Sequence, residues 1–192
     1  MDITDFEWLN PPQTWSVENN KLTVETDLNT DFWRETHYGF TRHSGHLFGC
    51  EVEGDFTFEV CVQGEFEELY DQAGLMIHSD DQNWCKAGLE FSDGQPLMSS
   101  VLTHQQSDWA TGPFNGDPGR FWMRATVENN VLRLQYSTDG KHWPLLRLCP
   151  IAPASKRLVG AMCCTPERGG LKIVFSEFRL SKPLGKALHD LS

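Results

Sequence analysis

Apolar and polar residues alternate along most of the chain, in short runs separated by Gly, Asn and Asp. A period of two is typical of β-strands that bury one face and are joined by turns. In the segment 54–64, for example, every second residue from Phe56 to Val62 is a large apolar one. Helical periodicity is nearly absent. The pattern therefore predicts an all-β protein.

The same pattern predicts about ten strands. The segment 119–148 predicts two consecutive hairpins, turned at Asn129-Asn130 and Asp139-Gly140, because these dipeptides tolerate the positive φ of tight turns. The other expected strands span 21–25, 36–40, 54–64, 72–78, 84–91, 98–103, 158–164 and 171–180. An antiparallel meander buries its apolar faces against a second sheet or by closing on itself. We expect a two-sheet sandwich, with a barrel as the alternative.

The length of 192 residues suits one domain. We expect a single β-sandwich over 1–180, followed by a tail, 181–192, that is either a short helix or frayed. Twelve Phe, seven Trp and three Tyr, with only 22% charged residues, supply enough apolar surface for a folded core. Disorder is excluded on composition.

The charge balance excludes several classes of partner. With 27 acidic and 16 basic residues the net charge is −11, and no basic run offers phosphate neutralisation, so nucleic acid is not an expected partner. No segment reaches the roughly 18 apolar residues of a membrane span, so no membrane contact is expected either. The acidic, proline-broken start does not resemble a targeting signal, which favours a cytoplasmic protein.

The metal-binding residue types show no recognised spacing. The six cysteines form no C-x-x-C pair and are expected to be reduced and mostly buried. His37, His43 and His46 match no metal signature and are interpreted as polar surface residues. Asp80 and Asp81 are interpreted as a hairpin turn rather than a calcium loop. The sequence thus predicts no metal and no cofactor.

Three strands place polar and aromatic side chains opposite their apolar faces. We expect them to form one mixed face, with these members: Gln72, Gly74, Met76 and His78; Trp84, Lys86, Gly88 and Glu90; Arg120, Trp122, Arg124 and Thr126. Mid-strand glycines often mark the close approach of a ligand or of another backbone. Buried charges require partners or a ligand, and Gln72, Arg124 and Asp108 are the candidate partners of Lys86 and Glu90. The alternative to a binding site is a face covered by a loop, with the charges in structural ion pairs.

The segment 103–122 is long and rich in turn residues, which is typical of a binding loop. It carries Asp108 and Trp109, although Asp108 also suits a turn cap. Aromatic rings flanked by charged groups suit sugars, because C–H faces pack on rings while hydroxyls hydrogen-bond to the charges. The candidate ligand-binding residues are Gln72, Trp84, Lys86, Glu90, Asp108, Trp109, Trp122 and Arg124.

The run 70–109 resembles the core of the domain-of-unknown-function 1349 family. The blocks D-Q-A-G-L, W-x-K-x-G-x-E and S-D-W of that family fall on 71–75, 84–90 and 107–109, and the segments 31–40 and 122–143 also resemble it. The resemblance implies a concanavalin A-like jelly-roll sandwich of two antiparallel sheets, whose concave face holds carbohydrate in related lectins and glucanases. The E-x-D-x-x-E carboxylate strand of the glucanases is absent here, which argues against their mechanism.

Three functions remain open. The first is binding of a carbohydrate or sugar-derived ligand on the concave face. The second is a sugar-active hydrolase or isomerase that uses Glu90 with Asp108 or Asp71, since glycosidases need two carboxyls about 5–10 Å apart. Lys86 and Arg124 are expected to keep Glu90 ionised, which makes it a poor general acid. The third is a regulatory protein that binds a metabolic enzyme, as the name of a fungal member of the family suggests, with exposed aromatics as anchors.

Overall fold

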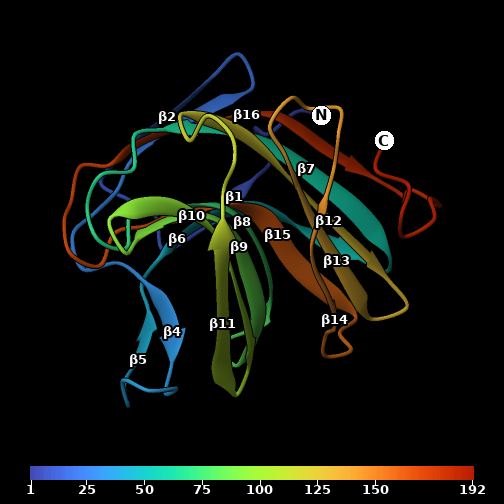
Figure 1. The fold of residues 1–192 in the computed structure, drawn as a ribbon, viewed down its shortest axis with the longest axis horizontal. Helices are drawn as coiled ribbons and strands as arrows, with labels where there is room; N and C mark the ends of the chain where they lie inside the picture. The colour runs from blue at the N-terminus through green and yellow to red at the C-terminus, as the bar shows by residue number, and fades with distance from the viewer.

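The computed structural model describes all residues from 1 to 192 and contains sixteen β-strands and no helix. Fourteen of the strands form two seven-stranded antiparallel sheets, which lie one over the other as two layers (Figure 1). Sheet A has the order β1 (Glu7–Leu9), β6 (His46–Glu53), β15 (Lys156–Cys164), β8 (Gln72–Asp80), β9 (Asn83–Ser92), β10 (Gln95–His104) and β11 (Gln106–Pro113). Sheet B has the order β14 (Leu145–Pro150), β13 (Val131–Ser137), β12 (Arg120–Glu128), β7 (Phe56–Gly64), β16 (Lys172–Ser181), β3 (Lys21–Glu25) and β2 (Thr14–Glu18). The predicted sandwich of two antiparallel sheets is confirmed, and the barrel alternative is wrong.

The core lies between the two sheets and follows the predicted alternation. The apolar side chains of β7, from Phe56 to Val62, are fully buried, and Leu75 of β8 and Leu89 of β9 face them from sheet A. The polar residues of the same strands consequently occupy the outer face of each sheet. This sorting decides which residues are available for a site.

A separate hairpin is formed by β4 (Phe32–Arg34) and β5 (Thr41–His43), which pair only with each other. The hairpin projects beside β11 at one end of the sandwich (Figure 1). The strand expected at 36–40 is wrong, because these residues form the connection between β4 and β5. Glu35 and His37 have φ of 61° and 63°, and a β-strand does not accommodate these values.

Most of the other expected strands and turns are confirmed. Asn129 and Asn130 turn the hairpin of β12 and β13 with φ of 51° and 58°. At the next turn, the Asp139 carboxylate accepts hydrogen bonds from the backbone N–H groups of Lys141 and His142, both at 2.8 Å. The expected loop at 103–122 is only partly a loop, since it contains the edge strand β11.

The tail after Ser181 forms neither a helix nor a strand. It is held against the outer face of sheet B by backbone contacts: Arg133 Nη2 donates to the carbonyls of Leu188 and Asp190 at 3.2 Å, and the Trp143 N–H donates to Leu191 at 2.8 Å. The expectation of a short helix is therefore wrong, and the tail is docked rather than frayed.

Two glycines face each other in the middle of sheet A, Gly74 on β8 and Gly88 on β9. A Cβ on Gly74 would lie 1.9 Å from the carbonyl oxygen of Ala87, and one on Gly88 would lie 2.0 Å from that of Ala73. A mid-strand glycine can mark the close approach of a ligand or of another backbone, and here it is the backbone of the neighbouring strand that approaches. The pair leaves a bare strip of backbone on the outer face between Lys86 and Glu90.

Candidate functional site

The expectation that three strands share one face is wrong. Gln72, Lys86 and Glu90 lie on the outer face of sheet A, but Trp122 and Arg124 lie on β12, which belongs to sheet B. The outer faces of the two sheets point away from each other, so these two groups cannot meet. Alternation along a strand distinguishes inside from outside, but it does not tell which sheet the strand joins.

Arg124 and Trp122 have structural partners on sheet B. Arg124 Nε donates to Glu59 Oε1 at 2.6 Å, and its guanidinium lies 3.8 Å from the ring centroid of Trp143. Trp122 Nε1 donates to Glu177 Oε2 at 3.1 Å. On sheet B the alternative to a binding site therefore holds: the charged residues form structural ion pairs, and another part of the chain covers them.

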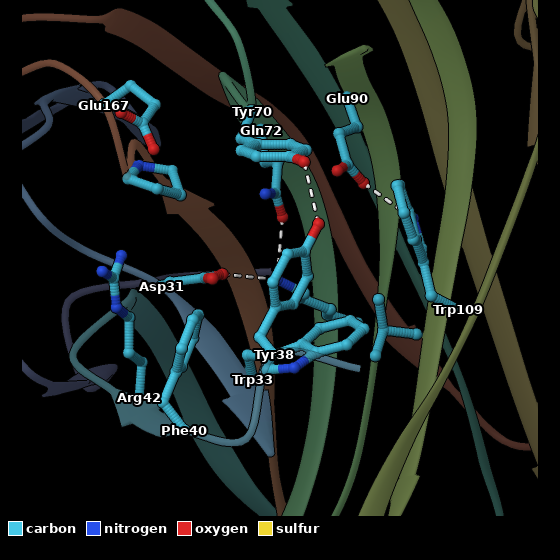
Figure 2. A pocket seen from close by; sticks show the side chains of 13 residues that line it. Asp31, Trp33, Tyr38, Phe40, Arg42, Tyr70, Gln72, Glu90, Trp109 and Glu167 are labelled. Atoms are coloured by element: carbon cyan, nitrogen blue, oxygen red, sulfur yellow. Dashed lines mark hydrogen bonds and ion pairs between the residues drawn. The ribbon is translucent and has the colours of Figure 1, made fainter. Parts of the chain in front are cut away.

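The cavity on sheet A has a volume of about 150 Å³ and lies between the outer face of that sheet and the hairpin of β4 and β5. Figure 2 shows Arg42, Phe40 and Asp31 on one side and Glu90 and Trp109 on the other. The lining residues are Asp31, Trp33, Tyr38, Phe40, Arg42, Tyr70, Gln72, Lys86, Glu90, Val101, Trp109, Pro166 and Glu167. Four of the eight predicted ligand-binding residues line it: Gln72, Lys86, Glu90 and Trp109.

Lys86 forms the floor of the cavity and is only 3% exposed. Its Nζ donates to Asp31 Oδ1 at 2.9 Å and to Gln72 Oε1 at 2.8 Å. Burial acts to lower the pKa of Lys86, but the neighbouring Asp31 and other acidic groups outweigh it and raise that pKa. Lys86 is therefore a fixed cation, and the ammonium group has three donors, of which the protein uses two.

Glu90 lies on the same strand, and both hydrogen bonds that its carboxyl accepts end on one oxygen. Ser99 Oγ donates to Oε2 at 2.6 Å and Trp109 Nε1 at 3.2 Å, which leaves Oε1 available to a ligand. Burial raises the pKa of Glu90, although Lys86 and Ser99 act in the opposite direction. The expectation that its neighbours keep Glu90 ionised overlooked the cost of burial, and Arg124, one of those two neighbours, is on the other sheet.

Glu90→Gln is expected to stabilise the protein progressively as the pH rises above 4.5. The folded protein holds the Glu90 proton at pH values where the unfolded chain has lost it, so the free energy of unfolding of the wild type falls across that window. The amide does not titrate, and its oxygen still accepts from Ser99 and Trp109. Urea unfolding of both proteins at a series of pH values measures the difference, and an offset that is constant with pH contradicts the raised pKa.

Aromatic rings build the wall opposite this charged floor. Trp33 and Trp109 meet edge to face with centroids 6.3 Å apart, and the rings of Tyr38 and Phe40 stack at 5.5 Å. The hydroxyls of Tyr38 and Tyr70 lie 3.0 Å apart, and this contact, together with burial, raises the pKa of Tyr70 to about 12. Tyr70 is consequently a neutral phenol at physiological pH and can both donate and accept a hydrogen bond.

The remaining predicted residues lie outside the cavity. Trp84 is buried beneath the hairpin, 5.9 Å from Phe32 between ring centroids. Asp108 accepts from Arg147 Nη2 at 2.8 Å, and it points to the opposite side of β11 from Trp109. It therefore does not cap a turn. Asp71 is fully buried, where it binds Arg168 and the backbone N–H groups of 67 and 68.

Sequence reasoning missed the part of the cavity that the hairpin contributes. Asp31, Trp33, Tyr38, Phe40 and Arg42 all come from the segment 31–42. The aromatic density of this segment is a usable signal, but the sequence pattern predicts an ordinary strand at 36–40. Once the strand at 36–40 is replaced by a hairpin connection, its side chains become available to cover sheet A.

The histidines also differ from expectation. His46 is buried, and its ring nitrogens contact the carbonyl of Asn10 at 2.8 Å and the N–H of Asp27 at 3.1 Å. His43 is half-buried and meets His78 and Asp81. Only His37 of the three is exposed as expected.

Comparison with known proteins places the chain in a family. The model of the family described as "Protein of unknown function (DUF1349)" matches residues 8–183. The chain belongs to this family. It is 56% identical over 191 residues, covering 100% of this chain and 96% of the relative, to Regulation of enolase protein 1 of Saccharomyces cerevisiae. A solved structure of a functionally unknown protein from Saccharomyces cerevisiae is 54% identical and superposes with a TM-score of 0.94 over 96% of this chain and all of that one.

The sandwich of this DUF1349 protein also resembles solved structures of low sequence identity. A mutant of the GH43 protein BlXynB from Bacillus licheniformis is 17% identical, with a TM-score of 0.70 over 93% of this chain and 37% of that one. The carbohydrate binding module CBM66 from Bacillus subtilis is 14% identical, with a TM-score of 0.57 over 91% and 95%. These likenesses show the jelly-roll fold. None of the elements in the structure is a helix that would cross a membrane.

Proposed function

We propose that this DUF1349 protein binds a carbohydrate or sugar-derived ligand in the cavity between sheet A and the hairpin, without hydrolysing it. The observation that carries the proposal is a wall of aromatic rings facing a buried floor of Lys86, Gln72 and Glu90. A sugar ring presents C–H faces that pack on aromatic rings and hydroxyls that hydrogen-bond to charged groups. The volume of about 150 Å³ is well below the roughly 300–1,000 Å³ of pockets for drug-sized molecules, which suits a single small ring.

The polar groups of the floor are already oriented for such a ligand. Lys86 is fixed by Asp31 and Gln72, and Glu90 is fixed by Ser99 and Trp109, so little side-chain entropy is lost on binding. Lys86 has a third N–H to donate, and Glu90 Oε1 accepts. The low identity to CBM66 supports the fold alone, but a module of that fold that is named for carbohydrate binding is consistent with the proposal.

Binding without turnover is favoured because the carboxyls predicted to act with Glu90 lie elsewhere, and because Asp31, which lines the cavity together with Glu167, is held by Lys86. A glycosidase places two carboxyls across the scissile bond. The two partners considered for Glu90, Asp108 and Asp71, do not line the cavity and are held by Arg147 and Arg168. The raised pKa of Glu90 makes it a usable proton donor, so the enzymatic alternative is tested directly: turnover of an identified sugar that is lost in Glu90→Gln would replace binding by catalysis.

Trp109→Ala is expected to weaken sugar binding about 10-fold or more, because it removes a packing surface and one of the two donors to Glu90. Calorimetric titration with a panel of mono- and oligosaccharides measures the effect. Trp15→Ala, which removes a tryptophan that is 45% exposed on β2 of sheet B, is the matched control and should bind as the wild type does. Absence of binding by the wild type to any sugar, or equal affinity of the Trp109 variant, contradicts the proposal.

A second candidate function is regulatory binding to a metabolic enzyme, and the name of the 56% identical yeast relative is the observation that favours it. Exposed aromatic residues such as Trp15 and Tyr38 would then serve as anchors. Size-exclusion chromatography of the protein mixed with purified enolase tests this candidate. Separate elution of the two proteins at micromolar concentration counts against it.

The proposal also places the protein in the cytoplasm. All six cysteines are free, and five of them are buried. Free, unpaired thiols are typical of reducing compartments. No nucleic-acid partner belongs to the proposal, in keeping with the net charge of −11.

A further inference from the structure

Three side chains of types that commonly bind metals converge beside the hairpin, outside the cavity on sheet A. His43 lies at the end of β5, His78 lies on the outer face of β8, and Asp81 lies in the turn after β8. The Nε2 atoms of the two histidines are 3.3 Å apart, and Asp81 Oδ1 is 3.3 Å from His43 Nε2 and 3.7 Å from His78 Nε2. None of the three lines the cavity.

The triangle of ligand atoms has the size that a metal ion requires. A triangle with sides of 3.3, 3.3 and 3.7 Å has a circumradius of about 2.0 Å, so one point lies about 2.0 Å from all three atoms. This equals the distances of about 2.0–2.1 Å for Zn–N(His) and about 2.0–2.2 Å for Zn–O(carboxylate).

The surroundings suit an ion that enters from solvent. Asp81 is 76% exposed, whereas the side chains of His43 and His78 are 21% and 12% exposed, so the site is open on one side only. His43 directs Nε2 toward His78 and Asp81, and its Nδ1 is buried without a hydrogen-bond partner.

We propose that His43, His78 and Asp81 bind one divalent transition-metal ion of the zinc class, with water completing the coordination. Two imidazoles and one carboxylate favour Zn²⁺, Co²⁺ or Fe²⁺ over Mg²⁺ and Ca²⁺, which prefer all-oxygen sites. The ion would join β5 of the hairpin to β8 of sheet A. The ion would thereby hold the hairpin, which lines the cavity, against sheet A. The proposed metal site does not depend on which ligand the cavity binds.

Chelator-treated protein titrated with Co²⁺ should develop visible d–d absorption bands that saturate at one equivalent. Zn²⁺ should displace the Co²⁺, and Mg²⁺ and Ca²⁺ should not. Asp81→Asn and His78→Gln should each weaken binding by at least about 100-fold, because the loss of outer-shell partners alone costs 10- to 100-fold. Asp81 is exposed, so the first variant should fold normally. His104→Gln, which alters an exposed histidine bonded to Asn83, is the control and should bind as the wild type does.

Hydrogen exchange locates the ion. Zn²⁺ should slow exchange of the hairpin amides in the wild type and leave those of the Asp81→Asn variant unchanged. The proposal is overturned if the wild type takes up no ion, if the Asp81 and His78 variants bind as tightly as the wild type, or if intense sulfur-to-metal charge-transfer bands show that the cysteines are the ligands. Uptake without protection of the hairpin places the ion elsewhere and also overturns it.

Discussion

Lys86→Ala is expected to lower the free energy of unfolding by about 3–5 kcal/mol, the cost of removing one partner from a buried ion pair. The Asp31 carboxylate would keep its place near the cavity floor without the ammonium group 2.9 Å away, and Gln72 Oε1 would lose its donor at 2.8 Å. Such a loss is a large fraction of the roughly 5–15 kcal/mol that stabilises a typical domain. Urea unfolding at neutral pH measures it.

Lys156→Ala is the matched control. Its Nζ lies 2.6 Å from Glu51 Oε1, closer than in the Lys86 pair, but both side chains are more than half exposed. Exposed pairs contribute about 0–1 kcal/mol, so the control should change stability little. The double variant Asp31→Ala with Lys86→Ala should lose less than the sum of the two single variants. Additive losses, or equal effects of the Lys86 and Lys156 variants, would show that Lys86 is not a buried, paired charge.

Gly88→Ala is expected to destabilise the protein by about 3 kcal/mol or more, at or above the upper end of the usual cost of overpacking. The added Cβ would lie 2.0 Å from the carbonyl oxygen of Ala73 and 2.7 Å from Gly74 Cα, and both of these are backbone atoms that no rotamer change can move. The strands β8 and β9 would have to separate at the centre of sheet A. Since Gln72 and Lys86 lie on either side of this point, affinity for the proposed sugar ligand should fall as well.

Gly112→Ala tests whether the effect comes from the close approach or from the loss of a glycine as such. Gly112 lies on the edge strand β11, and a Cβ there would meet no atom within 4 Å. Its replacement should be neutral or slightly stabilising, because alanine restricts the unfolded chain. If both glycine variants lose similar stability, close backbone packing is not the reason for Gly88.

The sequence predicts the fold well because alternation is a local property of each strand. The inward positions of β7, β8 and β9 follow directly from the period of two, and the turns at Asn129-Asn130 and Asp139-Gly140 follow from the φ preferences of these residues. The pairing of strands is not local. Arg124 and Lys86 have the same pattern in their own strands, yet they lie on opposite sides of the molecule, because β12 pairs with β7 and β9 pairs with β8 and β10.

The sequence predicts only those residues of the candidate site that lie on sheet A, and not those that the hairpin of β4 and β5 contributes. Gln72, Lys86 and Glu90 could be grouped because β8 and β9 are neighbours in sequence and form a hairpin. Asp31 could not be assigned to Lys86, since the contact spans 55 residues and depends on how the hairpin of β4 and β5 docks. The meeting of His43 with His78 and Asp81 is hidden for the same reason, and the spacing of the histidines within 37–46 gives no indication of it.

The hairpin pairs with no strand of either large sheet, although it supplies much of the cavity wall. Substitutions in the loop between its two strands therefore leave the sandwich core and its strand ladder untouched. Under the proposed function, ligand selectivity can therefore diverge in this loop without a penalty in folding. Exchanging the residues between Arg34 and Thr41 with those of another DUF1349 protein is expected to change the ligand preference and to leave the free energy of unfolding nearly unchanged.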